Sequence, residues 1–260
     1  MKNQNGSIAS SSSNIAYNSA SSVATDASGN IYTAGCSGNT ETGGGYFTHD
    51  YGFLRKCDST GTKLWEQQFA ITNAKQKNSG YMPQLALDGA GNVCITGTMG
   101  GNYFLNKYGP DGTLKWTQSS GTDQYYGVTT DSNGNVYVQG NESQKLTFSK
   151  YASSGTLVWK NSFDLPKGAG QYIAVDSSGN IYLVGWTQAE LNKQKPEGTY
   201  VGFIVKYDAS ANLKWTVLKG KSYTYFQGVT IDDEDNLILT GVDFSLVNKS
   251  NAFVTKYDTH

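Results

Sequence analysis

Apolar and polar residues alternate over short stretches of this chain, and Gly, Asn, Asp and Ser separate the stretches. Alternation with a period of two is typical of a β-strand with one buried face, and helical spacing is almost absent. In one unit, residues 127–131, 136–140, 147–151 and 156–160 are predicted to form four strands joined by tight turns. The pattern therefore predicts an all-β protein.

This unit recurs along the chain. Each copy starts at an Asp turn, mostly Asp-x-x-Gly-Asn, continues with an apolar run and ends at a single Gly. The five copies are residues 26–35, 88–97, 131–140, 176–185 and 232–241. A repeated unit of four antiparallel strands is typical of a β-propeller blade. We therefore expect one domain, residues 1–260, with blades at residues 20–70, 80–120, 124–164, 170–220 and 225–260.

The last repeat ends before a fourth strand, which would leave an unpaired sheet edge. Residues 6–10 align with residues 112–116, and Ile8 takes the place of Leu114. We therefore expect residues 1–12 to form the closing strand of the last blade, although Ser10 stands where other fourth strands have Trp. The alternative is a fragment of a longer array of repeats.

The repeat phrases resemble those of the SBBP family of bacterial β-propellers. That family has Gly-Asn-Val-Tyr-Val-x-Gly followed by Phe-x-x-Lys-Tyr-Asp-x-x-Gly-x-Leu-x-Trp. Similar phrases stand at residues 134–140 with 148–159 and at residues 179–185 with 203–215, and the resemblance extends over about residues 20–260. It implies an exported, non-enzymatic interaction domain and transfers no catalytic residue. Members usually have more blades than the five expected here.

The composition argues against some classes of partner. A net charge of −1 provides no basic surface for nucleic acid or anionic lipid, and no run of apolar residues is long enough for a membrane span. Low charge (16%) with 18 Tyr is typical of an extracellular domain, so we expect a secreted or cell-surface monomer. Residues 1–6 lack the apolar stretch of a signal peptide, so either export is not encoded in this sequence or a leader was removed. We expect no cofactor.

Four kinds of residue recur with the repeats, and each has a structural explanation. The Asp residues are expected to cap turns, since the intervening residues offer too few ligands for calcium, and only residues 232–235 could hold a cation weakly. Cys57 and Cys94 replace Tyr and are expected to be buried. The Trp residues should pack neighbouring blades together: Trp65, Trp116, Trp159 and Trp215. The Lys residues should pair with the turn Asp, with an anion-binding ring as the alternative: Lys56, Lys107, Lys150, Lys206 and Lys256.

Loops of unequal length gather on one face, and turns of equal length on the other. Binding residues concentrate on loops held by a rigid scaffold, and Tyr and Trp suit both protein and sugar ligands. We expect some of these loop aromatics to fold over the core. The candidate ligand-binding residues are Tyr46, Tyr51, Tyr103, Tyr125, Tyr126, Trp186, Tyr200 and Tyr225.

Catalysis is not expected. His49 and His260 are the only histidines, and no nucleophile–base arrangement is evident. We expect a non-enzymatic binding or scaffold module for a protein or glycan. One alternative is a lectin with a single sugar site, because unrepeated loops argue against one site per blade. A second, less favoured alternative is a glycoside hydrolase, which needs paired carboxylates that the sequence does not mark.

Overall fold

The structure is a computed structural model that describes residues 16–39, 51–70, 83–99, 102–120, 124–220, 223–246 and 249–259. All regular elements in these ranges are β-strands, which confirms the all-β prediction. No helix in the described part of the chain is long and apolar enough to cross a membrane.

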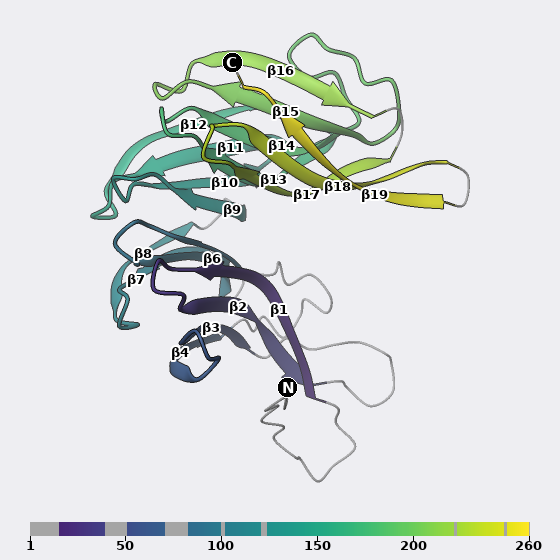
Figure 1. The fold of residues 1–260 in the computed structure, drawn as a ribbon. Helices are drawn as coiled ribbons and strands as arrows, with labels where there is room; N and C mark the ends of the chain where they lie inside the picture. Colours follow the sequence, from purple (N-terminus) through teal and green to yellow (C-terminus); the bar gives the residue numbers. More distant parts are fainter. Residues whose placement is uncertain are drawn as a thin grey trace.

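The strands form five antiparallel sheets in chain order, which are the blades of a β-propeller (Figure 1). Blade 1 contains β1 (Ala16–Thr25), β2 (Ile31–Asn39), β3 (Tyr51–Cys57) and β4 (Lys63–Ala70). Blade 2 contains β5 (Gln84–Leu87), β6 (Val93–Met99), β7 (Asn102–Tyr108) and β8 (Leu114–Ser120). Blade 3 contains β9 (Gln124–Thr130), β10 (Val136–Glu142), β11 (Lys145–Tyr151) and β12 (Leu157–Asp164).

Blade 4 contains β13 (Gly168–Val175), β14 (Ile181–Thr187), β15 (Val201–Tyr207) and β16 (Leu213–Lys219). Blade 5 contains β17 (Thr224–Ile231), β18 (Leu237–Leu246) and β19 (Lys249–Tyr257). Within the described residues this last blade has three strands, and the closing strand expected from residues 1–12 lies outside them. The prediction of five blades is confirmed.

The Asp turn between the first two strands of each blade is built as the sequence predicts. In blade 1, Asp26 Oδ1 accepts hydrogen bonds from the backbone N–H groups of Ser28 (3.0 Å) and Asn30 (2.9 Å). Gly29 has a φ of 77°, which an L-residue adopts at a cost. The Asp turns of the other four blades have the same two bonds from backbone N–H groups.

The single Gly that ends each repeat phrase lies where a neighbouring strand approaches closely. A Cβ atom on Gly185 would lie 2.1 Å from the backbone oxygen of Ala169 on the first strand. It would also lie 2.7 Å from the ring of Phe203 on the third strand. The β13–β14 register shifts at this point, which brings the first strand inward as a β-bulge does. Only Gly fits there, which explains why the phrase repeats it.

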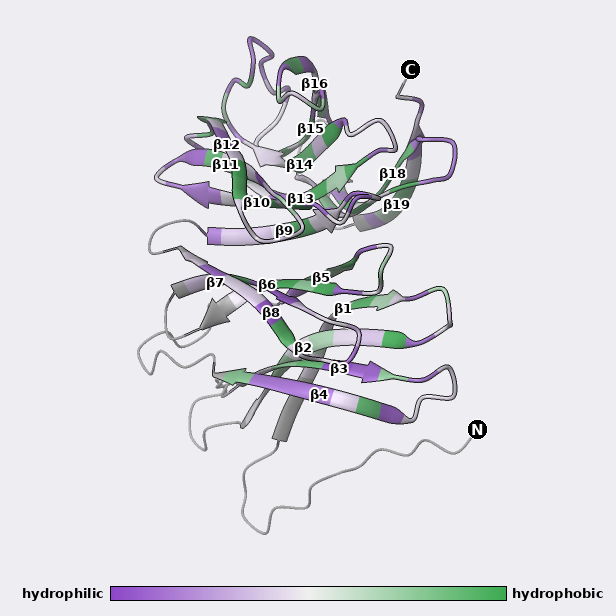
Figure 2. Ribbon diagram, turned by 90° about the vertical axis from the view of Figure 1, so that its left-hand side faces the viewer, coloured by the Kyte–Doolittle hydropathy of each residue, from purple (hydrophilic) through white to green (hydrophobic). Residues whose placement is uncertain are grey.

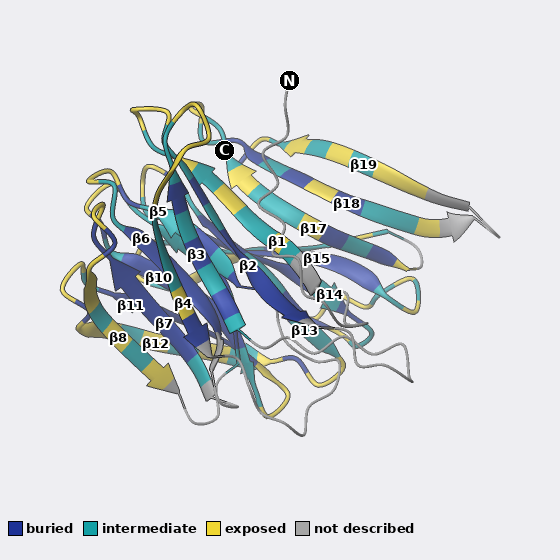
Figure 3. Ribbon diagram, turned by 90° about the horizontal axis from the view of Figure 1, so that it is seen from below, coloured by how far each residue is buried: buried dark blue, intermediate teal, exposed yellow. Residues whose placement is uncertain are grey.

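Burial changes across each blade. β14 and β15 are buried along most of their length, β3 alternates between buried and half-buried positions, and β12 is mainly exposed. Figure 3 shows the same contrast between the dark blue of β10 and the yellow of β19. Figure 2 shows hydrophobic (green) positions on β5 and many hydrophilic (purple) positions on β4. The core therefore lies between blades rather than in one central mass.

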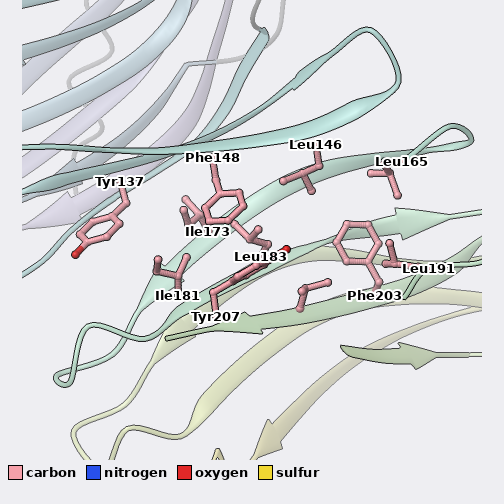
Figure 4. Packing of buried hydrophobic residues seen from close by; sticks show 11 residues of the cluster. Tyr137, Leu146, Phe148, Leu165, Ile173, Ile181, Leu183, Leu191, Phe203 and Tyr207 are labelled. Carbon is pink, nitrogen blue, oxygen red and sulfur yellow. The ribbon is translucent and has the colours of Figure 1, made fainter. Parts of the chain in front are cut away.

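The largest hydrophobic cluster joins blades 3 and 4 (Figure 4). Phe148 of β11 packs against Tyr207 of β15 with 4.7 Å between ring centroids, and Leu146 faces the same layer. Similar clusters join blades 1 and 2, 2 and 3, and 4 and 5. Burial of aliphatic and aromatic area at each junction stabilises the packing of adjacent blades.

The repeated Trp residues support these junctions, as predicted. The Trp65 indole N–H donates to the Pro110 carbonyl of blade 2 (2.9 Å), and Trp116 donates to Ser153 of blade 3 (3.0 Å). Trp159 packs against the cluster between blades 3 and 4, and Trp215 against the cluster between blades 4 and 5. These indoles are structural.

Candidate functional site

Five aromatic side chains meet at the long-loop ends of blades 4 and 5. Trp186 is near the end of β14, Tyr200 directly precedes β15, Tyr223 and Tyr225 lie at the start of β17, and Phe244 is near the end of β18. We call these five residues the aromatic cluster. Three of them, Trp186, Tyr200 and Tyr225, are candidates from the sequence, so the structure brings part of the predicted set together.

Ring contacts run through the whole cluster. Tyr200 lies at its centre, with ring centroids 5.2 Å from Trp186, 5.3 Å from Tyr223 and 5.6 Å from Tyr225. Tyr200 and Tyr223 are stacked, with an angle of 29° between their planes. Tyr225 meets Phe244 edge to face at 6.4 Å. Such pairs stabilise one another beyond their burial, so the rings form one ordered surface.

The segment between β14 and β15 is held in place by a tight turn. Leu191 and Gln194 exchange two backbone hydrogen bonds (3.0 and 2.9 Å), and Asn192 and Lys193 between them have positive φ angles of 48° and 65°. The Leu191 side chain is only 2% exposed. Asn192 also donates from Nδ2 to Thr216 Oγ1 of β16 (2.6 Å). This long connection is therefore anchored between its two cluster residues, Trp186 and Tyr200.

The backbone also ties the cluster together. The Thr224 N–H donates to the Tyr200 carbonyl (2.8 Å), and the Phe244 N–H donates to the Tyr223 carbonyl (3.2 Å). Tyr223 has a φ of 52°, in the left-handed region that a residue with a large side chain rarely adopts. Strain of this kind persists where surrounding contacts hold it and is frequent at binding sites.

The cluster offers both ring surface and hydroxyl groups. Tyr223 is 44% exposed and Phe244 is 47% exposed, whereas the other three rings are half-buried. Burial, followed by the nearby Tyr200 and Tyr223, raises the pKa of Tyr225. Its hydroxyl therefore remains protonated at neutral pH and can donate a hydrogen bond to a ligand.

The remaining candidates lie elsewhere. Tyr125 is only 6% exposed and packs in the core between blades 2 and 3, where Tyr103 also contacts that core. Tyr126 is half-buried and donates from its hydroxyl to Gln124 Oε1. Tyr51 is half-buried in β3, and Tyr46 lies outside the described residues.

The sequence analysis missed Tyr223 and Phe244 as site residues. Tyr223 stands in a short connection between blades, and Phe244 lies beyond the Gly that ends the fifth repeat phrase. The polar Asp243 and apolar Phe244 continue the alternation of β18, which was the available signal for an exposed end of that strand.

On the opposite face, which we call the turn face, the predicted Lys–Asp pairs form in four blades. The Lys Nζ to Asp Oδ2 distances are 3.7 Å in blade 1, 2.8 Å in blade 2, 3.7 Å in blade 3 and 2.7 Å in blade 5. The prediction is wrong for blade 4, where Lys206 donates to the Thr259 carbonyl (2.9 Å) and lies over the Tyr182 ring (5.2 Å). The Tyr182 hydroxyl contacts Asp176 Oδ2 in its place (2.9 Å).

A tyrosine on the second strand decides how close the lysine comes. In blade 1, Lys56 lies over the Tyr32 ring (4.8 Å), and in blade 3, Lys150 lies over the Tyr137 ring (4.9 Å). The Tyr137 hydroxyl contacts Asp131 Oδ2 at 3.1 Å. Blades 2 and 5 have no such tyrosine, and there the ammonium group pairs directly with the carboxylate.

Two acidic residues of the blade 5 Asp turn, Asp232 and Glu234, bind the ammonium group of Lys256. Lys256 Nζ lies 2.7 Å from Asp232 Oδ2 and 3.3 Å from Glu234 Oε2. Asp235 instead accepts a hydrogen bond from the Ser177 N–H of blade 4 (2.9 Å). In the described ranges, no group of three His, Cys, Asp or Glu side chains is placed to hold a metal ion.

The cysteines are free thiols in the structure. Cys94 is fully buried as predicted, and burial raises its pKa to about 12, so it remains a neutral thiol. Cys57 is only half-buried, which is less than the sequence analysis predicted. The raised pKa of Cys94 is the opposite of the lowered pKa of a reactive thiolate.

Solved structures with a similar fold include proteins of different activities. A gluconolactonase from Xanthomonas campestris has a TM-score of 0.51 at 15% identity, over 84% of this chain and 68% of its own. The Dos1 propeller has a TM-score of 0.51 at 11% identity, over 87% of this chain and 68% of its own. A virginiamycin B lyase from Staphylococcus aureus has a TM-score of 0.52 at 11% identity, over 94% of this chain and 74% of its own. Likeness at this identity shows the fold alone.

No curated protein matches the chain. Two segments, residues 115–141 and 170–192, match the beta-propeller repeat family SBBP. The first covers most of β8 in blade 2 with β9 and most of β10 in blade 3, and the second covers most of β13 and all of β14 in blade 4. The resemblance indicated by the sequence is thereby confirmed, and these two segments are SBBP beta-propeller repeats.

Proposed function

We propose that this protein is a non-enzymatic binding module that holds a protein or carbohydrate partner on the aromatic cluster. The observation that supports the proposal is the gathering of five aromatic rings from two blades at one place. Two of the rings are nearly half exposed. Tyr and Trp provide large contact area at a small entropic cost and are enriched where proteins bind ligands.

A lectin with a single sugar site is the second candidate, and the stacked pair Tyr200–Tyr223 favours it. The apolar faces of sugar rings pack on aromatic rings, and a hydroxyl such as that of Tyr225 can bind their polar edges. Among the described residues the cluster occurs once, where blades 4 and 5 meet, which fits one site better than a site in every blade. A glycoside hydrolase is a weaker candidate, because the aromatic cluster itself contains no carboxylate pair.

The test is a binding screen on the purified chain, with a glycan array for sugars and pull-down from culture medium for proteins. We expect Trp186→Ala and Tyr223→Ala each to weaken binding by about tenfold or more, as for a central interface residue. Tyr126→Ala is the matched control, since it removes a half-buried tyrosine outside the cluster. Binding that survives both cluster variants but is lost in Tyr126→Ala would overturn the proposal. No signal on the array would exclude the lectin.

A further inference from the structure

A pocket of about 360 Å³ opens on the turn face, between blades 2 and 3. It is independent of the aromatic cluster, which lies at the other ends of the strands and at another junction. Turns of both blades form its wall, and most of the side chains that line it are polar. The residues that matter for its chemistry are Asp88, Lys107, Lys115, Ser132, Asn133 and Ser153.

In blades 1 and 4 the lysine of the third strand fills the equivalent position. In blade 1, the Lys56 ammonium donates to the Pro110 carbonyl of the next blade (3.2 Å). In blade 4, Lys206 donates to the Thr259 carbonyl, at the same position of the next turn (2.9 Å). In these two blades, which both have a second-strand tyrosine, the lysine head group thus bridges to the following blade.

Blade 2 departs from this arrangement because Cys94 stands in place of the tyrosine. Lys107 Nζ pairs with Asp88 Oδ2 (2.8 Å) and donates to the Gly134 carbonyl (2.9 Å). The Tyr32 hydroxyl of blade 1 contacts the equivalent two acceptors. Lys107 therefore replaces the missing hydroxyl and leaves empty the position that its counterparts occupy, beside Ser153.

The buried carboxylate in the wall is fully engaged. Asp88 Oδ1 accepts from the backbone N–H groups of Ala90 (3.0 Å) and Asn92 (2.9 Å), and Oδ2 accepts from Asn92 Nδ2 and Lys107. The Lys107 ammonium has three N–H groups, and among the described residues two acceptors are recorded for it. The side chains of this ion pair are only 2% and 3% exposed, and both residues line the pocket. The third N–H group of Lys107 is therefore left for a ligand in the pocket.

A second lysine on the wall lacks the partner that its counterpart has in blade 4. In blade 4, Lys214 pairs with Asp208 at the first position of the turn (2.8 Å). Blade 2 has Gly109 at that position, and Lys115 in place of Lys214. Within the described part of the chain, Lys115 has no carboxylate at ion-pair distance, although Asp111 acts on it from farther away. Two departures from the repeat thus leave ammonium groups at one pocket.

We propose that this pocket binds a small oxyanion. Two ammonium groups and one neutralised carboxylate make the wall net positive, and the Ser132 and Ser153 hydroxyls and the Asn133 amide supply further donors. The volume lies at the lower end of the range for small-molecule sites. Phosphate, sulfate and carboxylate share the chemistry that such a wall recognises, namely several negatively charged oxygens within one small group.

The test is a titration of the purified chain with sodium phosphate, sodium sulfate and sodium acetate, against sodium chloride at matched ionic strength. Calorimetry and two-dimensional NMR would report binding. We expect saturable binding of at least one oxyanion, with shifts in the amide signals of residues 88–92 and 132–134. Lys115→Met should weaken it about tenfold, as for loss of one charge-assisted contact. Lys214→Met, which removes the equivalent lysine of blade 4, should leave it unchanged.

Cys94→Tyr is the second variant, because it should return Lys107 to the position seen in blades 1 and 4 and fill the pocket. We expect this variant to lose binding while it keeps the fold. Should it fail to fold, the Lys115→Met and Lys214→Met pair still decides. No saturable binding to any of the three oxyanions, or equal binding by Lys115→Met and wild type, would overturn the proposal.

Discussion

Blades 2 and 5 contain the same ion pair in two environments. Lys107 lies 2.8 Å from Asp88 in blade 2, and Lys256 lies 2.7 Å from Asp232 in blade 5. The two side chains are 2% and 3% exposed in blade 2 but 53% and 23% exposed in blade 5. Since the distances are almost equal, burial is what distinguishes the pairs.

Two different features of the chain determine the Lys–Asp distance and the burial of the ion pair. The distance follows the second-strand residue, because Cys94 and Ile238 both leave the lysine free to reach the carboxylate, whereas Tyr32 does not. The burial of the blade 2 pair follows the next blade, whose Gly134 lies directly against Lys107. Two ion pairs with almost the same distance can therefore differ greatly in what they contribute to the free energy of unfolding.

The largest expected effect is on the buried pair. Lys107→Met should lower the free energy of unfolding by about 3–5 kcal/mol, because it leaves the Asp88 carboxylate buried without its charge partner. Urea unfolding followed by tryptophan fluorescence measures the change. A loss below about 1 kcal/mol, the range of exposed pairs, would contradict the importance of burial.

The Lys107–Asp88 pair should also have a smaller effect, on how much stability the protein loses in acid. Burial acts to raise the pKa of Asp88, but hydrogen bonds from Lys107 and Asn92 outweigh it, and the pKa is lowered from 3.8. A carboxyl with a lowered pKa in the folded state contributes stability above its unfolded pKa, and this is lost as pH falls through the folded value. We therefore expect wild type to lose more stability between pH 7 and pH 3 than Asp88→Asn.

Urea unfolding of both proteins at the two pH values measures this difference. Asp232→Asn in blade 5 is the matched control, because it removes the exposed counterpart. Equal losses in wild type and Asp88→Asn would show that Asp88 does not contribute to acid sensitivity.

Much of the scaffold could be predicted from the sequence because its causes are local. An Asp turn bonds its own backbone, so Asp26 and its counterparts mark the turns without knowledge of neighbours. Alternation likewise predicts strands, and repetition predicts blades. The position of Lys107 could not be predicted in this way, because it depends on a residue of another strand, Cys94, and on a carbonyl of another blade, Gly134.

The aromatic cluster was only partly predictable for a similar reason. Trp186, Tyr200 and Tyr225 stood out as loop aromatics, but so did Tyr125, which is buried in the core. Sequence position indicates which face a residue lies near, whereas burial depends on how adjacent blades pack. Phe244 joins the cluster only because β18 continues past its repeat phrase.

An intermediate effect should follow from removing one hydroxyl in blade 3. Tyr137→Phe removes the group 3.1 Å from Asp131 Oδ2 and keeps the ring under Lys150. We expect a loss of about 1 kcal/mol in the free energy of unfolding, typical of one hydrogen bond. Urea unfolding measures it, and a loss as large as that of Lys107→Met would contradict the assignment of ring and hydroxyl to separate roles.

The smallest effect should be at the exposed pair of blade 5. Hydrogen bonding to Lys256 lowers the pKa of Asp232 to about 2, yet both groups remain in contact with water. The solvent that screens their attraction also hydrates each charge when the other is removed, so Lys256→Met should leave urea unfolding unchanged within error. The same measurement in 1 M sodium chloride should show no difference either. If Lys256→Met instead destabilised the protein as much as Lys107→Met, distance rather than burial would set the strength of these pairs.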